Sequence, residues 1–406
     1  MNKQYLLTER AHLMCPNMCF GIAVAIDAPY DFKRIKDSIT ALEIAHPFLR
    51  ALLGYENNTN RYYYDISQYG KTTVTESSKN LNLPIQERIF KDYEEIIQKD
   101  FDLRKEGMLK ICTYNDEGST LVLFVFHHLL TDGRGGLGLV KEFIEKYVND
   151  INPNFVEERL IASMKDLPKN SKLSFVSNTL IKYCNQKWKK EKQMVSYSQY
   201  HEFASNYVKK DQVKHNLYVV GKDKLVEIAE KCKQAQVTTN DYLLAKMYIE
   251  DGTKKIIIAS DIREKILCYQ PGALGNYSTA FGITCKSVGK DPIKLAKIVH
   301  KKVKKALSND KTAMQVLSCY IAMDPGLIDA AAISALGPYE SKAGNFVGGV
   351  MFGYRKQNGY SITNLGKIEN PYIKNAMFIP PASPAIKKIV GILTVNGVMY
   401  KCTSQR

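Results

Sequence analysis

Along most of the chain, segments with the apolar spacing of strands alternate with segments that have the apolar spacing of helices. Residues 18–27 and 119–128 are almost continuously apolar, and each run predicts a strand. Residues 107–115 predict a partner strand, joined to the second run by the turn DEGS. Residues 32–53 carry apolar residues at helical spacing, with Pro47 at or just past the end of that helix. The same patterns predict strands at 60–67, 253–263, 345–354, 359–366 and 389–402, and helices at 85–100, 137–147 and 293–307.

Residues 150–212 break this alternation. They are polar, rich in Lys, Asn and Ser, and weakly periodic, so they predict a crossover with some helix. Residues 216–250 then predict strand, helix, turn and helix, with Thr239 able to cap the last helix. Both halves mix strands and helices, which indicates an α/β protein. We expect an N-terminal lobe over 1–155, a crossover linker over 156–212 and a C-terminal lobe over 213–406.

The strand over residues 119–128 ends in an unusual polar cluster. LVLFVF has no polar alternation and should be buried on both faces, so its end is a rigid platform. His127, His128 and Asp132 follow, with glycines at 133, 135, 136 and 138. A histidine there can remove a proton from a hydroxyl or amine. The glycines allow a tight backbone and close approach of a ligand.

Other interpretations of this cluster stay open on the residues alone. Adjacent histidines after a strand can simply be satisfied core residues. A metal site is less favoured, because neighbouring residues on a strand point to opposite faces. GRGGLG lacks both the Gly-Lys-Ser/Thr ending and the GxGxxG spacing of phosphate-binding loops.

Composition narrows the classes of partner and compartment. The net charge is +16, which favours anionic partners, although composition alone favours a solvated lysine-rich surface. Motifs for nucleic-acid binding are lacking, so we expect none. The nine cysteines include no CxxC pair, and Cys15 and Cys19 have no partners to complete a zinc site. The N-terminus lacks the apolar centre of a signal peptide, and no run approaches a membrane span, so we expect a cytoplasmic protein.

The motif HHLLTDG at residues 127–133 resembles HHxxxDG, which marks the chloramphenicol acetyltransferase-like superfamily. That superfamily includes condensation domains of peptide synthetases, alcohol acetyltransferases, polyketide-associated acyltransferases and wax ester synthases. Further segments are similar to the family pattern, in the expected order over nearly the whole chain: HPFLRALL, FDLRKEGMLKICTY, QVTTNDYLLAKM, SDIREKI, LGNYSTAFGI and SITNLGKI.

The resemblance implies two α/β-sandwich lobes with a central channel and the motif in mid-channel. It implies that His128 is a general base, that His127 supports it and that Gly133 leaves room beside the channel. Asp132 would be structural and pair with an arginine, for which Arg263 is the candidate. Ser278, Thr363 and Asn364 are candidate oxyanion donors, although Asn364 and Gly366 can equally form a simple turn.

The implied activity is transfer of an acyl group from a thioester to a hydroxyl or amine of a small molecule. Acyl-CoA, or the phosphopantetheine arm of an acidic carrier protein, would be the co-substrate, with no bound cofactor and no metal. A stand-alone amide-forming condensation enzyme of natural-product biosynthesis is an alternative within the same class. A non-catalytic binding member of the fold is the alternative from another class.

Overall fold

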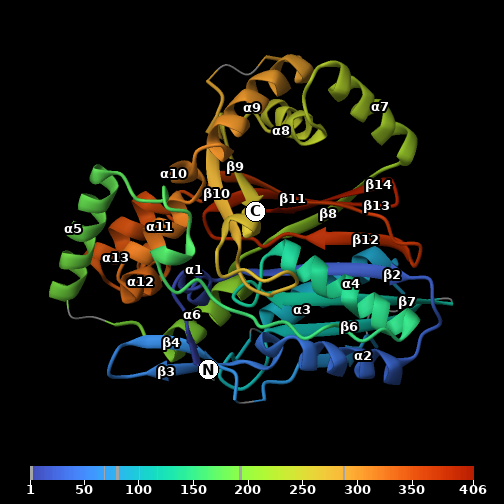
Figure 1. Cartoon of the computed structure of the whole chain (residues 1–406), viewed down its shortest axis with the longest axis horizontal. Helices are drawn as coiled ribbons and strands as arrows, with labels where there is room; N and C mark the ends of the chain where they lie inside the picture. Colours follow the sequence, from blue (N-terminus) through green and yellow to red (C-terminus); the bar gives the residue numbers. More distant parts are fainter. Residues whose placement is uncertain are drawn as a thin grey trace.

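Two β-sheets and their covering helices form the bulk of the molecule (Figure 1). The computed structural model describes residues 3–67, 69–78, 82–99, 101–116, 118–191, 194–286 and 289–406. Residue 100, at the end of an expected helix, and residue 117, in the expected DEGS turn, lie outside them. The structure therefore confirms an α/β protein with a sheet in each half of the chain.

The first sheet has five strands in the order β12-β2-β7-β6-β5. Every residue of β7 is buried, as its unbroken apolar run predicts, and β7 pairs antiparallel with both neighbours. Phe20 of β2 lies beside α4, whereas Gly21 lies beside Tyr93 of α3. Because successive strand residues face opposite sides, α3 and α4 cover opposite faces of this sheet. The elements are β2 (Cys19–Ile26), β5 (Thr73–Glu76), β6 (Leu109–Asp116), β7 (Ser119–His127), β12 (Ile373–Ile379), α2 (Phe32–Ala45), α3 (Ile85–Gln98) and α4 (Gly133–Asn149).

The second sheet has six strands in the order β10-β9-β11-β13-β14-β8. Strand β11 runs parallel to both β9 and β13, and the other pairs are antiparallel. Three helices, α7, α8 and α9, pack over it around a separate apolar core (Figure 1). The elements are β8 (Lys214–Val220), β9 (Lys255–Asp261), β10 (Ser278–Thr284), β11 (Gly359–Ile368), β13 (Ile386–Val395), β14 (Val398–Gln405), α7 (Lys222–Gln234), α8 (Thr239–Glu250) and α9 (Pro292–Leu307).

The sheets do not divide strictly at the expected lobe boundary of residue 213. Strand β12 comes from the C-terminal half, yet it pairs antiparallel with β2 at the edge of the first sheet. Residues 156–212 contain two helices, α5 and α6, that pack on elements from both halves of the chain. The remaining elements are β1 (Lys3–Tyr5), β3 (Leu52–Glu56), β4 (Arg61–Asp65), α1 (Arg10–Leu13), α5 (Phe175–Glu191), α6 (Tyr197–Lys210), α10 (Asp310–Ala313), α11 (Gln315–Ala322), α12 (Pro325–Leu336) and α13 (Lys342–Phe346).

Three local predictions were wrong. The single strand expected over 389–402 is the antiparallel hairpin of β13 and β14. Residues 345–354 are helical rather than a strand: α13 continues into a π-helical turn over Val347–Met351. A Cβ at Gly348 would lie 1.8 Å from the carbonyl oxygen of Ala331, so the glycine allows this segment to pack directly against α12. The cap of α8 is Thr238 rather than Thr239, because the Thr238 side chain accepts from the Asp241 N–H and Asp241 returns the contact.

Across the residues that the structure describes, no helix alone has the length and apolar composition to cross a bilayer. Helices α11 and α12, bent by 106° relative to each other, meet that test only as a pair.

Candidate active site

A cavity of about 440 Å³ lies where the two sheets meet, and most of the expected site residues line it. His128, Asp132 and Gly133 reach it from the end of β7 and the start of α4. The C-terminal half contributes residues from β9, β10 and β11. From that half, Arg263, Ser278, Thr363 and Asn364 line the cavity. His127 is the one expected residue that does not line it.

The sheet itself fixes the position of His128. The backbone N–H of His127 donates to the carbonyl oxygen of Met108 at 2.9 Å, and that of His128 donates to Met18 at 2.8 Å. The two sides of the strand end are thereby tied to neighbouring chain segments before the turn begins. The chain then turns, with the Leu130 N–H donating to the His127 carbonyl oxygen. A histidine at this place is held by backbone bonds rather than by a mobile loop.

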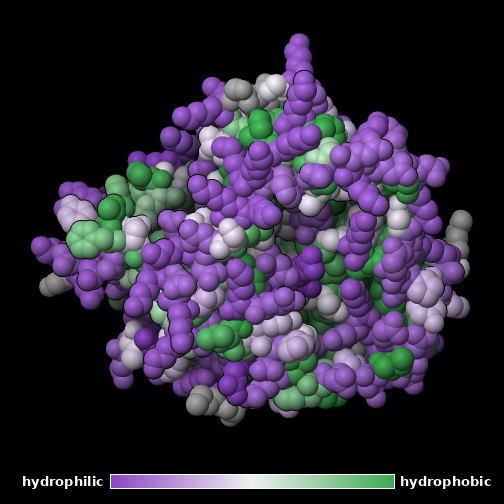
Figure 2. All heavy atoms as spheres, turned by 45° about the horizontal axis from the view of Figure 1, so that its top comes forward, coloured by the Kyte–Doolittle hydropathy of each residue, from purple (hydrophilic) through white to green (hydrophobic). Residues whose placement is uncertain are grey.

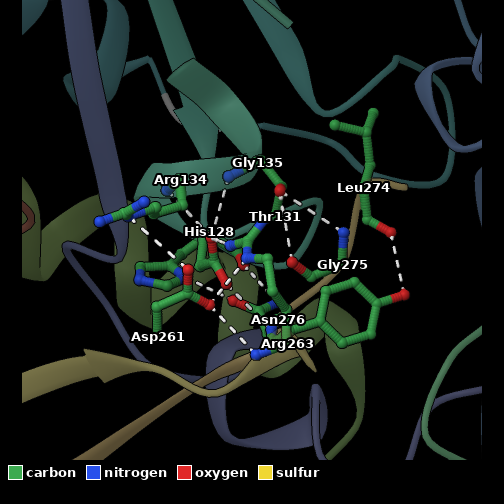
Figure 3. A network of polar contacts seen from close by, with 11 residues as sticks. His128, Thr131, Arg134, Gly135, Asp261, Arg263, Leu274, Gly275 and Asn276 are labelled. Carbon is green, nitrogen blue, oxygen red and sulfur yellow. Dashed lines mark hydrogen bonds and ion pairs between the residues drawn. The ribbon is translucent and has the colours of Figure 1, made fainter. Parts of the chain in front are cut away.

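Asn276 fixes the proton on the His128 ring (Figure 3). Its side-chain nitrogen donates to the carbonyl oxygens of His128, at 2.9 Å, and Leu129, at 3.2 Å. The side-chain oxygen therefore faces His128 Nδ1, 2.9 Å away, as an acceptor. Nδ1 must carry the proton, and Nε2 keeps a free lone pair. This is the tautomer that a general base acting through Nε2 requires.

Aromatic rings enclose the His128 ring and keep it neutral. His12 of α1 stacks on it, with ring centroids 4.3 Å apart and planes 7° from parallel, and Phe20 meets it edge-on. Burial lowers the pKa of His128, although its own carbonyl oxygen, Asp132 and Asn276 partly oppose this. The short helix α1 is anchored by Arg10, which forms a buried ion pair with Asp329 of α12. His12 is thus held against His128 by structure outside the cavity.

His127 faces away from the cavity and supports the turn. Its Nδ1 accepts the backbone N–H of Leu129 at 3.1 Å, and its ring meets Phe101 edge-on. Burial, with smaller contributions from His128 and Lys110, lowers the pKa of His127 to about 3. A ring that stays neutral and acts as an acceptor from the backbone belongs to the scaffold of the site.

Asp132 organises the loop after β7 and contacts Arg263. Its Oδ1 accepts the backbone N–H groups of Arg134 and Gly135, both at 3.0 Å, and so caps α4. Arg263 Nη2 lies 2.7 Å from the same oxygen, and the Tyr277 N–H donates to Oδ2 at 2.9 Å. Arg263 also contacts Asp261 at 2.7 Å (Figure 3). The carboxylate thus joins the N-terminal half of the site to β9 and β10.

The three candidate oxyanion donors differ in how far their polar atoms are already engaged. Asn364 Oδ1 accepts the Gly366 N–H at 2.8 Å, and its nitrogen lies 3.4 Å from Asn240 Oδ1. Gly366 has φ +91° and the register of β11 against β13 shifts here, so these two residues form a bulge within the strand instead of the simple turn of the competing interpretation. Ser278 and Thr363 line the cavity, and their hydroxyls have no hydrogen-bond partner among the described residues. They are better placed than Asn364 to donate to a ligand.

At three of the four glycines after Asp132, a Cβ would meet a close neighbour. A Cβ at Gly135 would lie 2.0 Å from Thr131 Oγ1, and one at Gly136 would lie 3.0 Å from Phe20. A Cβ at Gly133 would lie 2.7 Å from the Leu365 side chain, so this glycine lets α4 approach β11. Nothing lies within 4 Å of a Cβ at Gly138.

Sequence reasoning missed Asn276, His12 and Phe20 as parts of the site. Asn276 lies within LGNYSTAFGI, a segment that resembles the family pattern. The resemblance therefore marked the segment, but it did not indicate what Asn276 does. His12 and Phe20 have no comparable signal in the sequence. No group of three or more His, Cys, Asp or Glu side chains that could hold a metal occurs in the described part of the chain.

Comparison with known proteins reveals a likeness in structure alone. No family model matches the sequence, and no curated protein matches it. The condensation domain of the monacolin K polyketide synthase aligns over 100% of this chain and 92% of its own, with TM-score 0.61 and 10% identity. The epimerization domain of the third module of tyrocidine synthetase B aligns over 98% and 88%, with TM-score 0.56 and 12% identity.

A third solved structure is the starter condensation domain of rhizomide synthetase, in a mutant form complexed with C8-CoA and Leu-SNAC. It aligns over 100% of this chain and 89% of its own, with TM-score 0.58 and 9% identity. At such low identity the likeness concerns the arrangement of elements, and it extends over nearly the full length of each domain. The chain therefore has the fold of the condensation-domain superfamily, as its sequence resemblance implies.

Proposed function

We propose that the protein transfers an acyl group from a thioester to a hydroxyl or amine, with His128 as general base. The observation that carries this proposal is the Asn276–His128 contact, which leaves Nε2 unprotonated on a ring that lines the cavity. Burial lowers the pKa of His128, so the ring is neutral and ready to accept a proton at neutral pH.

The proposed reaction balances without a metal or redox partner. Nε2 takes the proton of the acceptor O–H or N–H as the acceptor atom attacks the thioester carbonyl carbon. The hydroxyls of Ser278 and Thr363 are the candidate donors to the oxyanion of the tetrahedral intermediate. The C–S bond then breaks, and His128 gives its proton to the departing thiolate. The products are a free thiol and an ester or amide.

The charge of the protein supports an anionic donor. The net charge of +16 fits coenzyme A or a phosphopantetheine arm on an acidic carrier. The rhizomide starter domain, which shares the fold, was solved with C8-CoA and Leu-SNAC. These points support a thioester donor and leave both kinds of carrier as substrates to test.

The fold alone does not choose the reaction, because an epimerization domain shares it. Ester formation, amide formation and non-catalytic binding therefore need separate measurements. The test incubates the protein with a panel of acyl-CoAs and acyl carriers and mixed alcohols and amines, and follows thiol release and products. Thiol release only from carrier-bound acyl groups, with amide products, would identify a condensation enzyme.

The role of His128 is tested with His128→Ala, and His300→Ala serves as the matched control. His300 lies on α9 and contacts Asp241, outside the residues that line the cavity. We expect His128→Ala to lower kcat by about 10²–10⁴-fold and to keep a cooperative unfolding transition, while His300→Ala keeps wild-type kcat. Equal rates for wild type and folded His128→Ala would contradict the base assignment. A folded wild-type protein that binds thioesters without releasing thiol would favour a non-catalytic role.

A further inference from the structure

The outer face of α5 exposes large apolar side chains. Phe175 is 84% exposed, Val176 74%, Leu180 37% and Tyr183 55%. The adjoining side of the helix is buried, through Ile181, Cys184 and Trp188. The helix is therefore firmly attached along one side, and its exposed apolar side is not needed to hold it in place.

The exposed apolar residues share one side of the helix. Val176, Leu180 and Tyr183 are spaced by four and then three residues, which places them above one another on the helix surface. Phe175 adds a further ring at the start of the helix. The result is a continuous stripe in place of scattered single exposures, and such patches mark interaction sites.

The chain around this stripe carries only positive charge. Residues 169–190 contain six lysines and no aspartate or glutamate. Lys187 and Lys190 are exposed on α5 and continue the stripe, four residues after Tyr183 and then three. The first acidic residue, Glu191, is engaged by the Ser341 hydroxyl and the Ala343 N–H. The apolar stripe is thus framed by lysines without local acidic partners.

The helix stands at the edge of the molecule. In Figure 1, α5 lies at the far left, beyond the helices α11, α12 and α13 that it packs against. Figure 2 shows hydrophobic side chains gathered at the same left edge among hydrophilic ones. A projecting apolar and basic edge fits a flat surface better than a groove on another protein. Helix α5 contributes nothing to the cavity that holds His128.

We propose that the outer face of α5 docks on an anionic lipid bilayer. Val176, Leu180 and Tyr183 enter the boundary between headgroups and acyl chains, and Phe175 extends this contact. Lys187 and Lys190, which continue the side of Val176, Leu180 and Tyr183, meet the phosphates and carboxylates of the headgroups. A helix with a basic face and an apolar face has these two attractions to a membrane surface. The contact is peripheral, and it does not depend on the proposed acyl transfer.

The test is co-sedimentation of the full chain with vesicles. One set contains phosphatidylcholine alone, and the other contains about one third phosphatidylserine. We expect the wild type to bind the anionic vesicles, to bind the neutral ones at least about tenfold more weakly, and to dissociate at high salt. The combined variant Val176→Ser, Leu180→Ser and Tyr183→Ser should bind anionic vesicles about tenfold more weakly or worse.

Matched controls change equally exposed positions elsewhere. Val219→Ser, Val226→Ser and Ile298→Ser remove apolar side chains that are 57%, 56% and 47% exposed, and should leave binding intact.

Charge is tested by a second pair of variants. Lys187→Glu with Lys190→Glu should weaken binding, and Lys294→Glu with Lys297→Glu, on α9, should weaken it much less. Equal losses in both pairs would show a general charge effect and overturn the proposal. The proposal would also be overturned if the wild-type protein did not bind anionic vesicles. If that protein dimerised in solution and the α5 serine variant did not, the occupant would be a second copy of the chain.

Discussion

Replacing Asp132 with asparagine tests whether the loop after β7 is held by the negative charge of the carboxylate or only by the size and shape of the side chain. The carboxylate accepts four hydrogen bonds, from Arg134, Gly135, Arg263 and Tyr277. Asparagine has the same size, and its oxygen can keep the bonds at the start of α4. Its amide nitrogen then faces the Tyr277 N–H, so two donors point at each other. The bond to Arg263 also loses its negative partner.

The magnitude follows from these two losses. Leaving the buried Tyr277 N–H without an acceptor costs about 1–3 kcal/mol, and the charged bond to Arg263 contributes about 1.5–3 kcal/mol. Arg263 keeps Asp261 at 2.7 Å, so its guanidinium is not left alone. We therefore expect the free energy of unfolding to fall by about 3–4 kcal/mol, in the lower half of the combined range.

The assay is urea unfolding, with the midpoint compared at an unchanged slope. Asp261→Asn is the matched control, because Asp261 also contacts Arg263 but its side chain is 27% exposed, against 4% for Asp132. The control should cost about 1 kcal/mol or less. If both variants shift the midpoint equally, or if Asp132→Asn unfolds like wild type with full activity, the reasoning is wrong.

Two further predictions concern histidines. The acidic limb of the pH profile of kcat/KM should lie below pH 6.5, because burial lowers the pKa of His128 and only the neutral ring acts as base. Asn276→Ala should lower kcat about tenfold to a hundredfold and move this limb to still lower pH, because the hydrogen bond from His128 to Asn276 raises that pKa in the wild type. An acidic limb that does not move would refute the positioning role of Asn276. Burial lowers the pKa of His46, but bonds to Glu142 and Glu158 outweigh it and raise it to about 9. His46→Gln should therefore lower the free energy of unfolding by about 3–5 kcal/mol near pH 7. The difference from wild type should fade as the pH rises through about 9, where wild-type His46 loses its charge. Urea unfolding at both pH values measures this difference, and a difference that does not depend on pH would contradict a role for the charge.

The sequence was a good guide wherever pattern and local chemistry agree. The apolar run ending in His127 predicts a fully buried strand, and the helix predicted over 137–147 lies within α4. The proximity of Asp132 and Arg263, by contrast, came from the family resemblance. No spacing rule connects residues 131 positions apart.

The remaining features depend on long-range contacts that produce no periodic pattern in the sequence. Asn276 reaches His128 across 148 positions, and His12 reaches it through an ion pair at the back of α1. Helix α12 is buried nearly all round, so its sequence has no polar side to reveal it. The segment 345–354 has strand-like valines and phenylalanine, but its glycines select close helix packing instead.

Strand β12 has a consequence for how the chain is synthesised and folded. All eight residues of β2 are buried, and one edge of β2 pairs with residues 373–379. Until the ribosome has released that segment, the N-terminal sheet ends in an unpaired apolar edge, which is a site for aggregation. Expression of residues 1–372 alone should therefore give insoluble protein, and the nascent N-terminal half should depend on chaperones until residues 373–379 have been synthesised.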